Sequence, residues 1–112
     1  MNNRMRPIHP GEVLREEFLT PLAMSATALA ALVHVPANRM TEIVAEKRSI
    51  TAGTALRLAK CFATTPQFWL NLQQAYDLRK AEGEKEIVAV LRMIKPAPLA
   101  ATKRAPKRRG GP

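Results

Sequence analysis

The residues with the clearest potential for chemistry lie on one face of a short segment, residues 35–46 (VPANRMTEIVAE). Within it, Met40, Ile43 and Val44 recur at i, i+3 and i+4, a spacing that predicts a helix over residues 36–45 with one apolar face. The opposite face of this helix, which is turned outward, carries Ala37, Asn38, Arg39, Thr41 and Glu42.

This outward face suits the major groove of DNA. An arginine donates a bidentate pair of hydrogen bonds to guanine, an asparagine pairs in the same way with adenine, and a threonine bonds a base or contacts a thymine methyl group. The small Ala37 allows the backbone to approach the duplex closely. We therefore predict that these five residues read bases. For Asn38 and Thr41 the alternative, a solvated polar face, stays open.

Cations and hydroxyl groups around the segment are placed to meet phosphates. Lys47 and Arg48 follow the helix, and His34 lies in the turn before it. Ser25 and Thr27, at the start of the preceding segment, complete the predicted phosphate-binding set.

Helix caps and turn signals divide the rest of the chain into short helices. Ser25 and Thr51 are suitable N-caps, and Thr65 is followed by a proline at the first helical position. Helices are predicted over residues 11–20, 26–33, 36–45, 52–62 and 66–80. The side chains predicted to face the core are Leu14, Phe18, Leu29, Leu32, Val33, Ala55, Leu58, Ala59, Phe62, Phe68, Leu72, Ala75 and Tyr76.

Residues 84–95 (EKEIVAVLRMIK) are ambiguous. Ile87, Leu91 and Ile94 recur at helical intervals, but IVAVL is also a β-branched apolar run. Helix is favoured because no second strand is available for pairing. Whether residues 84–94 form a helix or a strand stays open at this point.

The fold class that follows is all-α. The second and third predicted helices are joined by a turn of only a few residues (HVPAN), which is how a helix-turn-helix is built. We divide the chain into an N-terminal arm (1–9), a helix-turn-helix domain (10–80), a C-terminal helix (81–95) and a tail (96–112).

The charge is divided between the body and the tail. The 112 residues contain 18 Lys+Arg against 9 Asp+Glu, a net charge of +9. From Lys95 onward there are six cations, four prolines and no acids, a composition that predicts a disordered basic tail over residues 96–112. The tail either aids solubility or binds phosphates without reading sequence.

Several classes of site are excluded. The single cysteine, Cys61, forms no intrachain disulfide and is predicted to be a buried thiol among apolar neighbours. His9 and His34 lack further ligands at metal-binding spacing, so neither a metal nor a cofactor is expected. The carboxylates of the first helix have no nucleophile or metal motif beside them, so no catalytic residue is assigned and the chain is not expected to be an enzyme.

Two further expectations concern assembly and location. Trp69 and Tyr76 are predicted to lie in the core or at a dimer interface, and the candidates for that interface are Trp69, Leu72 and Tyr76. No run of residues approaches the roughly 18 apolar positions of a membrane span. A cytoplasmic protein is expected, associated with the nucleoid when bound to DNA.

Three strings in the chain carry a resemblance to a known family. HPGEVLREEFLTPLAMS, VPANRMTEIVAEKRSITAGTALRLAKCF and TPQFWLNLQQAYDL occur in order between Pro7 and Leu78. They resemble the HigA/VapI-type antitoxins, a branch of the Xre/Cro helix-turn-helix family. Two positions depart from the usual pattern. Ala26 replaces a glutamine that contacts phosphate, and Ala45-Glu46 replaces an Asn-Gly turn.

The resemblance implies a five-helix lambda-repressor-like bundle, here with an additional C-terminal helix. It also implies a homodimer that binds a palindromic operator, represses its own operon and neutralises a RelE/HigB-like mRNA-endonuclease toxin. The alternative is a stand-alone Xre-family transcriptional regulator with the same DNA chemistry and no toxin partner.

Overall fold

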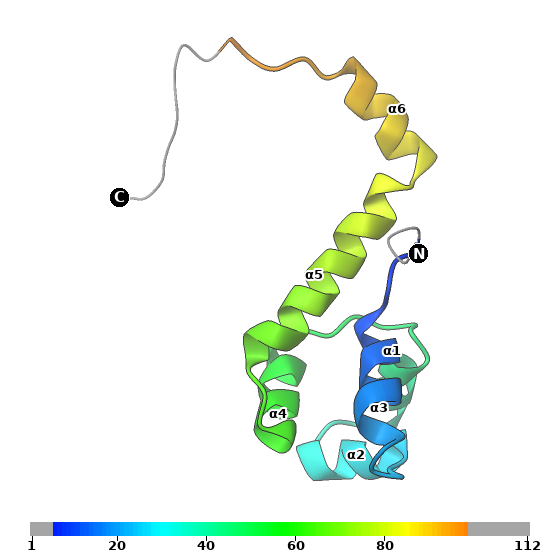
Figure 1. Cartoon of the computed structure of the whole chain (residues 1–112), viewed down its shortest axis with the longest axis vertical. Coiled ribbons are helices and arrows are strands. Elements are labelled where there is room, and N and C mark those ends of the chain that lie inside the picture. Colours follow the sequence, from blue (N-terminus) through cyan, green and yellow to red (C-terminus); the bar gives the residue numbers. More distant parts are fainter. Residues whose placement is uncertain (1–5, 99–112) are drawn as a thin grey trace, which may run out of the picture. The chain divides into compact units, whose positions relative to one another are not determined.

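The structure is a computed structural model that describes residues 6–98. The chain consists of two compact units, residues 1–81 and residues 82–112. The elements, in chain order, are α1 (Pro10–Val13), the π-helix η2 (Leu14–Leu19), α2 (Ala26–Val33), α3 (Ala37–Val44), α4 (Ala52–Phe62), α5 (Pro66–Glu82) and α6 (Lys85–Met93) (Figure 1). Every regular element in residues 6–98 is helical, which confirms the all-α prediction.

The first predicted helix is confirmed, but it changes type partway along. After Val13 the backbone hydrogen bonds widen, and the Thr20 amide donates to the Arg15 carbonyl five residues earlier, at 2.9 Å. A turn that takes more residues brings positions five apart toward the same face. Leu14 and Leu19 are consequently both buried.

The predicted helix pair, α2 and α3, lies in the middle of the first unit, and α4 packs against it. α3 packs on α2 and α1, and α4 packs on α2. Leu29 from α2, Met40 and Ile43 from α3, and Leu58 from α4 are completely buried. Removing any of these side chains to alanine costs about 2–5 kcal/mol in typical cores. Burial of Met40 and Ile43 turns the apolar face of α3 toward the core and leaves its polar face to solvent.

The inward face of α5 differs from the prediction. Phe68 and Ala75 are exposed, whereas Trp69 and Gln73 are buried. Trp69 packs its ring 5.1 Å from that of Phe18, and its Nε1 donates to the Thr64 hydroxyl at 2.8 Å. The large indole, with its polar atom satisfied, takes the central position and rotates its neighbour Phe68 toward the surface.

Two other predicted core positions are wrong. Leu32 is 59% exposed, because Leu29 and Val33 already occupy the face of α2 that meets the core. Cys61 is also exposed, on the outer side of α4, so it is not a buried structural thiol.

In the second unit, the helix over residues 85–93 excludes the strand alternative. None of the α6 side chains is buried. Residues 1–5 of the predicted arm and residues 99–112 of the predicted tail lie outside the described part of the chain.

Candidate nucleic-acid interface

The α2–turn–α3 unit has well-defined local ends. The Ser25 hydroxyl accepts a hydrogen bond from the Ala28 amide at 3.0 Å and caps α2. α2 ends at His34, which adopts a left-handed conformation (φ 58°), and the chain turns into α3 after Pro36. A proline at the entrance of a helix presets the backbone for the first turn. The short connection between the two helices follows from these local signals.

The five predicted base-reading residues all lie on the accessible side of α3. Ala37, Asn38, Arg39 and Thr41 are exposed, and Glu42 is half-buried. The Thr41 hydroxyl donates to the Asn38 carbonyl at 3.0 Å, which leaves its oxygen able to accept. Within residues 6–98, no carboxylate forms an ion pair with Arg39. Its guanidinium is therefore available to a nucleic acid.

A hollow of about 400 Å³ lies beside this face. Its rim contains Arg39 from α3, Arg48 and Ser49 from the following loop, and Thr51 and Thr54 from the start of α4. The rim carries two guanidinium groups and three hydroxyl groups, of which the Thr51 hydroxyl donates to Thr54 Oγ1 at 3.4 Å. Guanidinium groups and free hydroxyls are donors suited to a phosphate. Ser49, Thr51 and Thr54 were not among the predicted phosphate contacts, because nothing in their spacing indicates that the loop and the start of α4 border α3.

The remaining predicted phosphate contacts occupy exposed positions. Ser25, Thr27, His34 and Lys47 all have accessible side chains. The proton of the Ser25 hydroxyl is not used by its cap, which accepts a hydrogen bond. Arg48 is exposed as well, but its Nε donates to Glu42 Oε1 at 2.7 Å. A phosphate that binds Arg48 must compete with that carboxylate.

The loop after α3 is held by a residue that no motif in the sequence indicates. Gln73 of α5 is buried, and its Oε1 accepts a hydrogen bond from the Ile50 amide at 2.8 Å. Its Nε2 donates to Ser49 Oγ at 3.3 Å and to Asp77 Oδ1 at 2.9 Å. A buried glutamine that satisfies a loop amide fixes that loop, since an unpaired amide would be costly. In the sequence, the only signal for this role of Gln73 is a polar side chain at an inward-facing position of α5.

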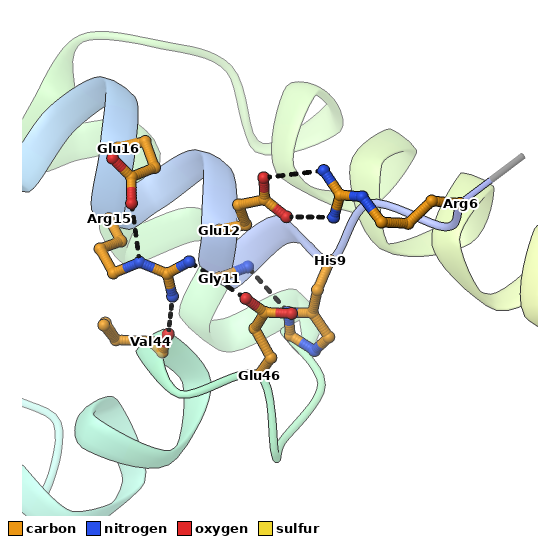
Figure 2. A network of polar contacts seen from close by, with 8 residues as sticks. All are labelled: Arg6, His9, Gly11, Glu12, Arg15, Glu16, Val44 and Glu46. Carbon is orange, nitrogen blue, oxygen red and sulfur yellow. Dashed lines mark hydrogen bonds and ion pairs between the residues drawn. The ribbon is translucent and has the colours of Figure 1, made fainter. Parts of the chain in front are cut away.

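The end of α3 is positioned by the first helix. Gly11 of α1 lies directly against the backbone of Ile43, and Arg15 of η2 donates through Nη1 to the Val44 carbonyl at 2.6 Å. Figure 2 shows this contact together with a pair between Arg15 and Glu46. On the N-terminal side, Arg6 makes a bidentate pair with Glu12 at 2.8 and 3.2 Å, which lowers the pKa of the Glu12 carboxyl.

His9 caps α1 with its ring. Its Nδ1 accepts a hydrogen bond from the Gly11 amide at 2.8 Å, and the ring packs edge-on against Tyr76 of α5, with centroids 4.7 Å apart. Only 3% of His9 is exposed, and this burial lowers its pKa. The cap requires the neutral ring, because a protonated Nδ1 cannot accept a hydrogen bond.

Stability is therefore expected to fall in mild acid through His9. A histidine whose pKa is lower in the folded state contributes fully above its unfolded pKa of 6.5, and the contribution is lost as the pH falls below that value. The expected loss is about 1 kcal/mol, the typical free energy of an N-cap. Urea titrations between pH 7.5 and 5 measure it. His9→Asn, which keeps a capping side chain without a titrating ring, should flatten this part of the profile. If the wild-type protein and His9→Asn show the same dependence of stability on pH, the role of His9 is contradicted.

The predicted dimer residues occupy two kinds of environment. Trp69 is 0% exposed within its own chain and offers no surface to a partner, which excludes it from the predicted dimer interface. Leu72 and Tyr76 are half-buried on α5.

Within residues 6–98, no group of three or more His, Cys, Asp or Glu side chains could hold a metal ion. No helix in that range is long and apolar enough to cross a membrane.

Comparison with known proteins provides the family. The chain is 53% identical over 89 residues to virulence-associated protein I of Dichelobacter nodosus, which covers 80% of this chain and 82% of the relative. It is 53% identical to a HigA-family addiction module antidote protein of Coxiella burnetii, whose structure superposes with a TM-score of 0.76 over 83% of this chain and 100% of that one.

The structure of Pseudomonas aeruginosa antitoxin HigA with the higBA promoter is 44% identical, with a TM-score of 0.77 over 81% of this chain and 98% of that one. No model of a protein family matches the chain. The family of these relatives is one of antitoxins and helix-turn-helix regulators rather than enzymes. The chain therefore belongs to the HigA/VapI-type antitoxin family of helix-turn-helix DNA-binding proteins.

Proposed function

We propose that this protein binds a palindromic operator as a homodimer and represses its own operon. The observation that carries the proposal is the exposed polar face of α3, with Arg39 available at its start and the hollow of arginines and hydroxyls beside it. Base-reading donors next to a phosphate site are the two parts that sequence-specific binding requires. The promoter-bound structure of the P. aeruginosa relative supports this assignment.

The proposed geometry places one copy of α3 in each of two successive major grooves, about 34 Å apart. Ala37, Asn38, Arg39, Thr41 and Glu42 read base edges, while Ser25, Thr27, His34, Lys47 and Arg48 contact phosphates. Leu72 and Tyr76 are proposed to contribute to the dimer interface. The net charge of +9 adds affinity through counterion release, which is independent of sequence.

The second part of the proposal is neutralisation of a toxin. Membership of the antitoxin family supports a protein partner, for which we propose a RelE/HigB-like mRNA endonuclease. The protein would act in the cytoplasm, on the DNA of its own operon.

DNA binding is tested with the region upstream of the protein's own gene. Fluorescence anisotropy should give at least about a thousandfold higher affinity for that region than for scrambled DNA of the same length and composition. Sedimentation should give one dimer per site. Equal affinities for the upstream region and the scrambled DNA would contradict the proposal that the protein binds an operator.

Toxin neutralisation is tested by co-expression with the neighbouring reading frame. If that frame encodes the toxin, its expression alone should stop growth, and co-expression of this protein should restore growth and give a complex that copurifies. A protein that binds its operator but fails to rescue growth would be a stand-alone regulator instead.

Lys47 provides a test of the phosphate contacts. Lys47→Ala should weaken operator and scrambled DNA by the same factor and lower the slope of log affinity against log salt by about one, because one phosphate contact is lost. The measurement is anisotropy across a series of salt concentrations. A loss confined to the operator would instead give Lys47 a role in sequence reading.

A further inference from the structure

The turn that follows α3 carries an uncommon conformation. Glu46 lies in the left-handed region (φ 66°), which glycine adopts freely and other residues adopt only at a cost. Its carboxylate also follows the carbonyl end of a helix, where a negative charge is unfavourable. The turn leads directly to Lys47 and Arg48, so its geometry decides where those cations point.

One side chain contacts both the carbonyl end of α3 and the Glu46 carboxylate. The Arg15 guanidinium donates through Nη1 to the Val44 carbonyl at 2.6 Å and pairs through Nη2 with Glu46 Oε2 at 3.1 Å. Its Nε pairs with Glu16 on its own helix at 3.1 Å, which orients the fork (Figure 2). A planar guanidinium makes these three contacts at once, whereas a lysine ammonium is a single point charge.

Arg15 acts on α3 from the side of the first helix. It reaches the last carbonyl of α3 from η2, whereas the proposed base-reading residues lie on the polar face of α3. Its contacts join positions 29 and 31 residues apart in the chain. Fixing the last turn of α3 restricts the rotation and tilt with which that helix meets a groove.

The geometry points to Arg15 as a positioning residue for DNA recognition: it clamps the end of α3 and the Glu46 turn to the first helix, and thereby sets the orientation of the base-reading face. The DNA part of this inference rests on the proposed operator binding. The clamp itself is a property of the free protein and has a separate readout.

The first experiment needs no DNA. Hydrogen exchange of the full-length protein should show that Arg15→Gln speeds exchange of the Ala45 and Lys47 amides by about tenfold, since both close the last turn of α3 through hydrogen bonds to Thr41 and Glu42. Arg6→Gln is the matched control. It removes the same charge and breaks the Arg6–Glu12 carboxylate pair, and Arg6 makes no hydrogen bond or ion pair to α3 among the described residues. Equal exchange at these amides in the two variants would overturn the clamp.

The second experiment measures DNA discrimination. Arg15→Gln should reduce the ratio of operator affinity to scrambled-DNA affinity by about fivefold, the scale at which remote residues alter a binding site. Arg15→Lys should recover part of the ratio, and Arg6→Gln should leave it unchanged. Equal loss on both DNAs, with a salt slope lower by about one, would make Arg15 a phosphate contact and overturn its positioning role.

The outcomes separate the two proposals. If the wild-type protein shows no preference for the operator, the proposed function is wrong. Hydrogen exchange at the Ala45 and Lys47 amides would still decide whether the clamp exists. A purely structural Arg15 would lower the thermal midpoint and leave the affinity ratio of the folded protein unchanged, which would also overturn the positioning role.

Discussion

Gly11→Ala is expected to lower the free energy of unfolding by about 3 kcal/mol, the upper range for overpacking a tightly filled site. A Cβ at this position would overlap the carbonyl oxygen of Ile43 and lie 2.9 Å from the carbonyl carbon and 3.0 Å from His9 Nδ1. Two of these atoms belong to the α3 backbone, which cannot rotate away as a flexible side chain can. The substitution therefore has to push α1 away from α3. Urea denaturation at pH 7.5 measures the loss.

Gly53→Ala is the matched control for this substitution. Gly53 is also helical, but a Cβ there would meet only Arg57 Nη1, at an ordinary 3.6 Å. Because alanine is the better helix former, this change should raise stability by about 0.5–1 kcal/mol. If the two substitutions change the free energy of unfolding in opposite directions, the destabilisation by Gly11→Ala comes from the α1–α3 contact. A Gly11→Ala protein as stable as wild type would contradict that contact.

Arg39→Ala is expected to weaken operator binding by about 1–3 kcal/mol, the discrimination that one bidentate contact to guanine provides. Arg39 is exposed on the outward face of α3 and borders the hollow beside it. Binding to scrambled DNA should fall much less, since one cation among 18 is removed. Anisotropy titrations on both DNAs at one fixed salt concentration provide the comparison.

Lys47→Ala is the control for this result, because it removes the same charge close to the end of the same helix. It should lower both affinities equally, so the ratio between the two DNAs separates base reading from charge. If Arg39→Ala also lowers both affinities equally, the Arg39 guanidinium binds a phosphate in the hollow. The other outward residues of α3 would then read the bases.

Local features of the chain predicted the helix-turn-helix well. Ser25 and Thr51 cap their helices as expected, and Met40 and Ile43 are buried as their spacing requires. The caps depend on residues within one turn, and the spacing of the apolar residues states which of them share a face of the helix. This is why the outward face of α3 could be named residue by residue.

Predictions that required neighbouring elements were less successful. Leu32 and Cys61 satisfy helical spacing but are exposed, and of the two positions open to Trp69, core or dimer interface, the structure shows the core. Periodicity states which residues share a face. It does not state how wide the covered part of that face is, because this depends on which helices pack there.

The sequence by itself determined an all-helical, basic protein with a polar recognition helix, and it indicated the family, because these properties follow from local spacing, composition and motifs. Only the tertiary structure decided how that helix is held. The contacts of Gly11 with Ile43, of Arg15 with Val44 and Glu46, and of Gln73 with Ile50 join residues 23 to 32 positions apart. Such contacts arise when packed helices bring their backbones together, and neither propensity nor periodicity specifies which distant carbonyl or amide will meet a given side chain.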